Sequence, residues 1–167
     1  LDATVGGPPI PLSPLPNVMV VVKTDGLPAG TSPFRRSVYL LARRNYHLTL
    51  MRVFDQPIVA RTCAVRKPSA MVTQSLALLH DEFLFDQSAR MADGILQQLP
   101  NATRLEHIDL AWRLVLGRLP NADEAELCVG TWARHVDRFA GSENPDRQAF
   151  AQICQMLLNT NEFLYLE

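Results

Sequence analysis

The chain has 167 residues, of which 47% are hydrophobic and 20% are charged, with a formal net charge of −1. This is the composition of a folded soluble protein long enough to bury a real core. No apolar run approaches the roughly 20 residues that cross a bilayer, and a nearly neutral chain lacks the charge typical of a nucleic-acid-binding domain. We therefore expect neither membrane insertion nor a nucleic-acid partner.

The N-terminal part of the sequence predicts an extended arm and one β-hairpin. Residues 1–33 hold seven of the twelve prolines, which remove backbone donors and oppose a helix. Val18–Val22 is a run rich in β-branched residues and Ser37–Leu41 is a second candidate strand. We predict that these two runs pair as a long-looped hairpin. The expected organisation is a Pro/Gly-rich arm over residues 1–33, carrying one strand and packing on a mainly helical domain over residues 34–167.

The rest of the chain predicts helices. A short helix is expected at Leu48–Phe54, and others begin near Ser69 and Asp81. Later helices are expected to begin at the caps Thr103, Asn121 and Asn144, the first two with a Glu three residues on. The predicted fold class is mostly α, a helical bundle of about five to six helices with a small N-terminal β-hairpin and a Pro-rich extended arm.

The sequence shows no signature of a known catalytic or metal site. It contains no Gly-rich phosphate loop, no H-E-x-x-H and no G-x-S-x-G. Three widely spaced cysteines form neither a zinc pattern nor a disulfide framework, and Cys128 and Cys154 are predicted to be buried small apolar groups. We expect no cofactor, no metal and no identifiable catalytic residue; the sequence favours a non-enzymatic role and leaves an enzyme open.

Charge is distributed unevenly along the chain. Residues 34–67 hold eight basic residues and one acid, a net charge of +7, whereas the remainder holds eight basic and sixteen acidic residues, a net charge of −8. Arginine forks bind carboxylates, sulfates or phosphates, and tyrosine faces stack on sugars. The candidate ligand-binding residues in this basic segment are Arg35, Arg36, Tyr39, Arg43, Arg44, Tyr46 and Arg66.

The same arginines have a structural interpretation, which we favour. Arginine is the usual choice for internal ion pairs, so these side chains are expected to pair with Asp55 and with carboxylates of the chain's own helices. In that case they fix the β element onto the bundle. The two interpretations differ in where the arginine side chains lie: they face an open cleft if they bind a ligand, and they form ion pairs within the chain if their role is structural.

Several motifs, taken together, resemble a known family. The motifs, in chain order, are Gly6-Gly7-Pro8-Pro9, Arg36-Ser37-Val38-Tyr39, Arg44-Asn45-Tyr46, Phe54-Asp55, Thr73-Gln74-Ser75-Leu76-Ala77-Leu78-Leu79, Ala111-Trp112-Arg113-Leu114-Val115-Leu116-Gly117-Arg118 and Leu158-Asn159-Thr160-Asn161-Glu162-Phe163-Leu164-Tyr165. They resemble the C-terminal domain of unknown function in large planctomycete cytochrome-c-like proteins. The resemblance covers nearly the whole chain. His80 departs from it, because the family more often has Asn there.

This resemblance implies a context and no chemistry. Such proteins look exported, because haem c is attached outside the cytoplasm, and we expect a periplasmic or cell-surface location. The chain opens with Leu1 instead of Met, so we expect it to be a piece of a longer precursor. The family has no established catalytic residues to carry over.

Two functions follow as hypotheses. The first is a non-catalytic C-terminal module that docks onto the upstream domains of the same precursor or onto other partners, and an exposed apolar patch would agree with it. The alternative is binding or processing of a polysaccharide, an acidic or sulfated glycan, through the Arg/Tyr-rich segment 35–66. The planctomycete context makes a carbohydrate role a reasonable expectation.

Overall fold

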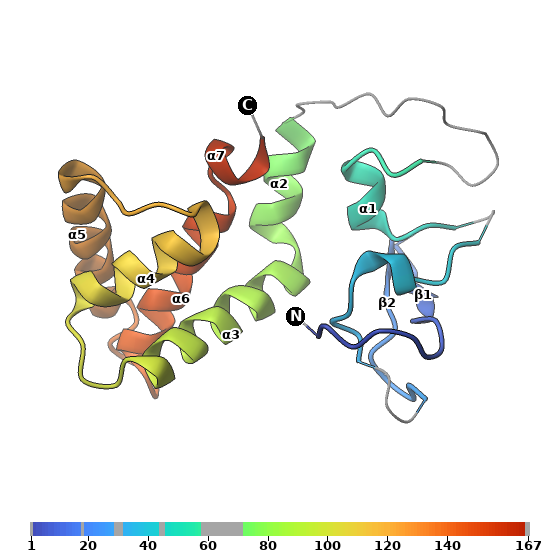
Figure 1. Cartoon of the computed structure of the whole chain (residues 1–167), viewed down its shortest axis with the longest axis horizontal. Coiled ribbons are helices and arrows are strands. Elements are labelled where there is room, and N and C mark those ends of the chain that lie inside the picture. Colours follow the sequence, from blue (N-terminus) through green and yellow to red (C-terminus); the bar gives the residue numbers. More distant parts are fainter. Residues whose placement is uncertain (1, 18, 29–31, 44–45, 58–71, 166–167) are drawn as a thin grey trace. The chain divides into compact units, whose positions relative to one another are not determined.

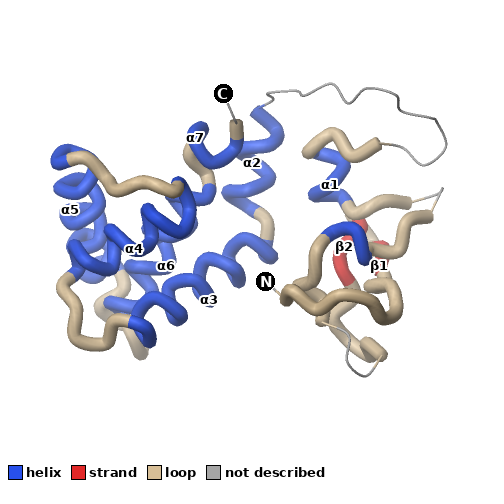
Figure 2. Tube along the Cα trace, viewed as in Figure 1, coloured by secondary structure: helices blue, strands red, loops and turns tan. Residues whose placement is uncertain are grey.

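The computed structural model describes residues 2–17, 19–28, 32–43, 46–57 and 72–165. Within these residues the chain is mostly helical, with a small N-terminal hairpin, as predicted (Figures 1 and 2). Contacts group it into two compact units, an N-terminal unit of residues 1–74 and a helical unit of residues 75–167. The predicted division after residue 33 stays a prediction. No helix in the described residues is long and apolar enough to cross a membrane.

The N-terminal unit contains the hairpin, but with a different pairing from the predicted one. Strand β1 (Leu12–Pro14) pairs antiparallel with β2 (Val20–Val22), with Ser13 opposite Val21. The predicted partner, Ser37–Leu41, is wrong, because Ser37–Tyr39 form a 3-10 helix. Pro14 is tolerated because a two-stranded ribbon has only edge strands, where a missing donor costs little.

The end of the 3-10 helix and the residues after it pair with Ile10, which precedes β1, instead of with β2. Ile10 forms an isolated parallel bridge with Leu40: the Ile10 N–H donates to the Tyr39 carbonyl at 2.7 Å, and the Leu41 N–H donates to the Ile10 carbonyl at 2.9 Å. The Ile10 side chain is fully buried. The unit also contains the short helix α1 (Thr49–Val53), close to its predicted span.

The other helices are α2 (Val72–His80), α3 (Glu82–Gln98), α4 (Arg104–Leu116), α5 (Ala122–Arg138), α6 (Pro145–Leu158) and α7 (Asn161–Leu164). Four of them, α3 to α6, begin directly after the residues predicted to start them, Asp81, Thr103, Asn121 and Asn144. Both predicted capping boxes are present, Thr103 with Glu106 and Asn121 with Glu124. The predicted cap at Ser69 lies outside the described residues. Helix α7 is an addition to the predicted set, which brings the described α-helices to seven.

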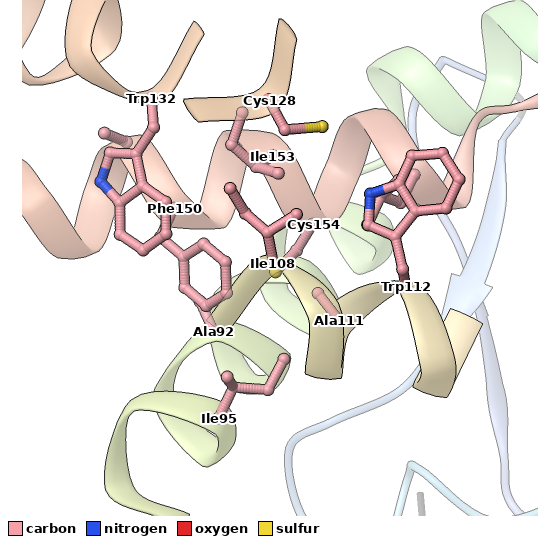
Figure 3. Close-up of a cluster of buried hydrophobic side chains, with 12 residues drawn as sticks. Ala92, Ile95, Ile108, Ala111, Trp112, Cys128, Trp132, Phe150, Ile153 and Cys154 are labelled. Atoms are coloured by element: carbon pink, nitrogen blue, oxygen red, sulfur yellow. The ribbon is translucent and has the colours of Figure 1, made fainter. Parts of the chain in front are cut away.

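The core of the helical unit surrounds α6, which packs against α3, α4 and α5. Trp132 of α5 stacks on Phe150 of α6, with 4.3 Å between the ring centroids (Figure 3). Cys128 and Cys154 are buried in the same cluster, as predicted, and burial raises the pKa of the Cys154 thiol to about 12. These thiols therefore serve as packing groups and carry no charge near neutral pH.

Candidate functional site

Arg35, the first candidate ligand-binding residue, lies inside the N-terminal unit. Its side chain is buried, with 6% exposed. Nη1 donates to the Pro8 carbonyl at 3.2 Å, Nη2 donates to the Gly6 carbonyl, and the guanidinium lies 3.7 Å from the centroid of the Tyr39 ring. A buried cation is stable only with such partners, because it loses its hydration. Arg35 thus binds the chain's own arm, through carbonyl oxygens and not through the carboxylates that we expected.

Tyr39 completes this arrangement. Its hydroxyl oxygen accepts a hydrogen bond from the Gly6 N–H at 3.0 Å. Gly6 and Gly7 have φ angles of 82° and 88°, in the left-handed region that favours glycine. The Gly-Gly-Pro-Pro segment therefore turns around Arg35 and Tyr39, which gives this motif a structural role.

The remaining described candidates lie nearer the surface. Arg36 and Arg43 are exposed and Tyr46 is half-buried. The Arg43 guanidinium lies 5.6 Å from the centroid of the Tyr46 ring, within the range of a cation–π contact. The two other candidates, Arg44 and Arg66, lie outside the described residues. The structure thus separates an internal pair, Arg35 and Tyr39, from an exposed Arg43–Tyr46 platform.

The described part of this segment borders a cavity too small for a sugar. The cavity lies beside Leu12, Leu41 and His47 and has a volume of about 10 Å³. This is about the space that one water molecule needs. This cavity therefore cannot hold a sugar ring.

His107 and Asp81 have structural roles. His107 is buried, with Nε2 2.8 Å from the Leu99 carbonyl oxygen, whereas His80 is exposed. Asp81 accepts a hydrogen bond from the Phe83 N–H as the cap of α3. No group of three or more His, Cys, Asp or Glu side chains within the described ranges could hold a metal ion.

Arg118 makes a polar cluster that the sequence analysis missed. Nη1 and Nη2 donate to the two carboxylate oxygens of Glu124, and Nε and Nη2 donate to those of Glu162, at 2.7–2.9 Å. The guanidinium also lies 4.6 Å from the centroid of a Trp112 ring. Arg118 holds the pKa of Glu162 below its usual value and, with the Asn121 N–H, lowers the pKa of Glu124 to about 2. This clamp fixes α7 to the α4–α5 junction.

Four exposed apolar side chains lie close together in the sequence where α2 meets α3. We call residues 76–85 the α2–α3 elbow; its exposed apolar side chains are Leu76, Leu79, Phe83 and Phe85, at 49%, 41%, 37% and 43% exposure. Helical spacing in the sequence predicts that Leu78 and Leu79 lie roughly on one face. The structure buries Leu78 and exposes Leu79, which shares a helix face with Leu76 at i, i+3.

The comparisons with known proteins give one match. A family model described as "PSD1: Protein of unknown function (DUF1553)" matches residues 1–132. No curated protein and no solved structure matches the chain.

Proposed function

Because the chain belongs to the PSD1 family of proteins of unknown function (DUF1553), we propose that it is a non-catalytic module that docks onto a partner through the α2–α3 elbow. The membership confirms the resemblance to a domain of unknown function. The observation that carries the proposal is the exposure of four large apolar side chains within ten residues of the chain. Exposed large apolar side chains are candidates for an interaction site, since their burial is favourable.

The charges of the elbow define the chemistry of the partner. Glu82 and Asp86 are exposed beside Phe83 and Phe85, so acidic groups adjoin the apolar ones. A complementary surface carries apolar side chains flanked by lysine or arginine, because like charges at a rim oppose association. The partner of the elbow is therefore an apolar segment with a basic margin.

The resemblance to planctomycete cytochrome-c-like proteins supports a partner within the same polypeptide. In this proposal the module is exported and docks onto a neighbouring upstream domain of its precursor. A tethered partner has a high effective concentration, so a modest interface suffices to keep the two domains together.

The test is calorimetric titration of this chain with the adjoining domain of the precursor, produced separately. Leu79→Ser is expected to weaken binding by about tenfold or more, because it removes apolar area at the interface. Leu114→Ser is the matched control: Leu114 is 62% exposed on α4 of the same unit, and its loss should leave the affinity within about twofold. Absence of binding, or equal weakening by both variants, would refute the elbow as the docking site.

The Arg43–Tyr46 platform supports a second candidate function, binding of acidic or sulfated glycans. An exposed guanidinium next to an aromatic ring offers both charge and a stacking face to a sugar. On an array of neutral, carboxylated and sulfated glycans, Arg43→Ala should abolish selective binding to the anionic glycans. Arg52→Ala removes the same charge from an exposed position of the same unit and should leave binding intact. No selective binding by the unmodified chain would remove this candidate.

A further inference from the structure

The outer face of α5 carries charged groups around one exposed leucine. Asp123, Glu126, Leu127, Gly130 and Arg134 recur at helical spacing and line a shallow depression of about 390 Å³. Leu127 is 60% exposed. Trp132 and Cys128, on the other side of the same helix, lie in the core. The depression thus belongs to a face that the helix directs away from the core.

The charges on this face are not used by the ion pairs that the structure describes in the helical unit. The ion pairs among the described residues join Arg104 to Asp146, Arg118 to Glu124 and Glu162, and Arg147 to Asp93. Glu126 and Arg134 take part in none of them. Arg134 donates one hydrogen bond, to the Thr131 hydroxyl at 2.9 Å.

Gly130 is exposed in the middle of α5, where glycine is the least favourable residue after proline. A Cβ atom at Gly130 would meet nothing within 4 Å. The described part of the chain therefore gives no packing reason for glycine at this position. A helix that crosses α5 at this point would give such a reason, because a missing side chain lets two backbones approach closely.

Glu126 and Arg134 are placed symmetrically about this glycine, four residues before it and four after it. A two-fold axis through the crossing point of two antiparallel α5 helices therefore brings Glu126 of each copy to the level of Arg134 of the other. Both levels lie about 6 Å from the crossing point, at 1.5 Å rise per residue. Glu126 and Arg134 are thus complementary to each other across such an axis, as a two-fold interface requires.

We propose that the chain forms a two-fold symmetric dimer through antiparallel crossing of α5 at Gly130. Residues 126, 130 and 134 form one i±4 row, and helices that pack such rows against each other cross at about −50°. This angle aligns the rows of the two copies, so each Glu126 pairs with Arg134 of the other copy, while Leu127 enters the groove beside the row. The proposal is independent of the docking function and uses a different face of the helical unit.

The test is sedimentation velocity of the full chain over a concentration series from about 10 to about 500 µM, a range suited to a small interface. In the Glu126→Arg dimer, residues 126 and 134 are both positive in each of the two symmetry-related pairs, and in the Arg134→Glu dimer both are negative. Each variant should therefore weaken dimerisation about tenfold or more. The double variant E126R/R134E restores both pairs with reversed sign and should return the dimer dissociation constant to within about threefold.

Gly130→Leu supplies a second, steric test. It should abolish the dimer, whereas Gly94→Leu should not, because Gly94 is also an exposed helical glycine whose Cβ would meet nothing within 4 Å. Circular dichroism of each variant checks that the helices are retained. A monomer at every concentration overturns the proposal, and so does a dimer that survives both Glu126→Arg and Gly130→Leu.

Discussion

The two units of the chain are stabilised by different kinds of interaction. In the N-terminal unit a buried cation, Arg35, holds backbone carbonyls of the arm, and bridges at Asp2 and Ile10 attach the arm to residues 35–40. In the helical unit the stacked rings of Trp132 and Phe150 lie in one apolar cluster, with ion pairs at its margin. The first unit is thus organised by polar contacts to an extended chain, the second by apolar burial between helices.

The units also differ in charge. The N-terminal unit has nine basic and three acidic residues, a net charge of +6, and the helical unit has seven basic and fourteen acidic residues, a net charge of −7. A near-neutral chain therefore consists of two strongly charged parts. The net charge of the whole chain would suggest no preference between anionic and cationic partners. Taken separately, the charge of the N-terminal unit favours anionic partners and that of the helical unit favours cationic partners.

The largest expected effect is loss of the apolar core. Phe150→Ala removes a fully buried ring that stacks on Trp132, and it should lower the free energy of unfolding of the helical unit by about 3–5 kcal/mol. Urea denaturation followed by tryptophan fluorescence measures this loss. Leu114→Ala, at an exposed position of α4, is the control and should change stability by less than about 0.5 kcal/mol. Similar losses in both variants would contradict an apolar core at Phe150.

The next effect concerns the polar organisation of the N-terminal unit. Arg35→Met keeps much of the side-chain shape but leaves the Gly6 and Pro8 carbonyls without their donor, at a cost of about 1.5–3 kcal/mol. Hydrogen exchange at the Ile10 and Leu41 amides, which join arm and 3-10 segment, should accelerate about 10- to 100-fold.

The neighbouring residue provides the control for this variant. Arg36 is exposed, so Arg36→Met removes the same charge and should leave exchange at Ile10 unchanged. Exchange within α6 should be unchanged in both variants if the two units are stabilised separately. Acceleration in α6 would show that the arm also supports the helical unit.

Local signals made much of the helical unit predictable. Capping boxes at Thr103 and Asn121 bring a side chain and an amide together within three residues, so their sequence spacing decides the structure. Gly117 ends α4 with φ of 72°, as the glycine suggested. The burial of Leu78 was also expected, but the exposure of Leu79 was not, because a run of apolar residues leaves the phase of a helix open.

The wrong strand pairing has a local cause, and the other omissions arise from contacts between distant residues. The true partner of β2, Leu12–Pro14, is near in sequence but lies among prolines, where the pattern indicated only an extended arm. The acceptors of Arg35 are carbonyls 27 and 29 residues away, and every residue carries a carbonyl, so no side-chain pattern identifies them. Glu162 lies 44 residues from Arg118, beyond the reach of any local motif.

A smaller effect separates two exposed glycines of the helical unit. Gly117→Ala introduces a Cβ at a left-handed φ of 72° and should lower stability by about 1 kcal/mol. Gly130→Ala lies in regular helix with open space around the new Cβ and should raise stability by about 0.5–1 kcal/mol. Urea denaturation at low protein concentration, where a dimer does not contribute, measures both. Changes of equal sign would contradict the assigned conformations.

The smallest expected effect is the acid response of the Arg118 clamp, because exposed ion pairs are weak in water. The folded-state pKa of Glu124 is about 2, below the ordinary glutamate value of 4.5, and the pKa of Glu162 is also lowered. A depressed carboxyl pKa contributes stability above the unfolded pKa and loses it as the pH falls through the folded pKa. The contribution of Glu124 should therefore be complete above about pH 4.5 and disappear toward pH 2.

Arg118→Gln separates the two causes of the lowered carboxyl pKa values, the hydrogen bonds from Arg118 and the hydrogen bond from the Asn121 N–H. Carboxyl titration by NMR should show the Glu162 pKa returning close to its ordinary value, because Arg118 is the main cause of its shift. The Glu124 pKa should rise less completely, because the Asn121 N–H still donates to this carboxylate at 2.8 Å in the capping box. Amide exchange in α7 should accelerate while exchange in α6 does not change. Unchanged titration of both carboxyls in the variant would show that Arg118 does not bind them in solution, and the attachment of α7 would then not depend on this clamp.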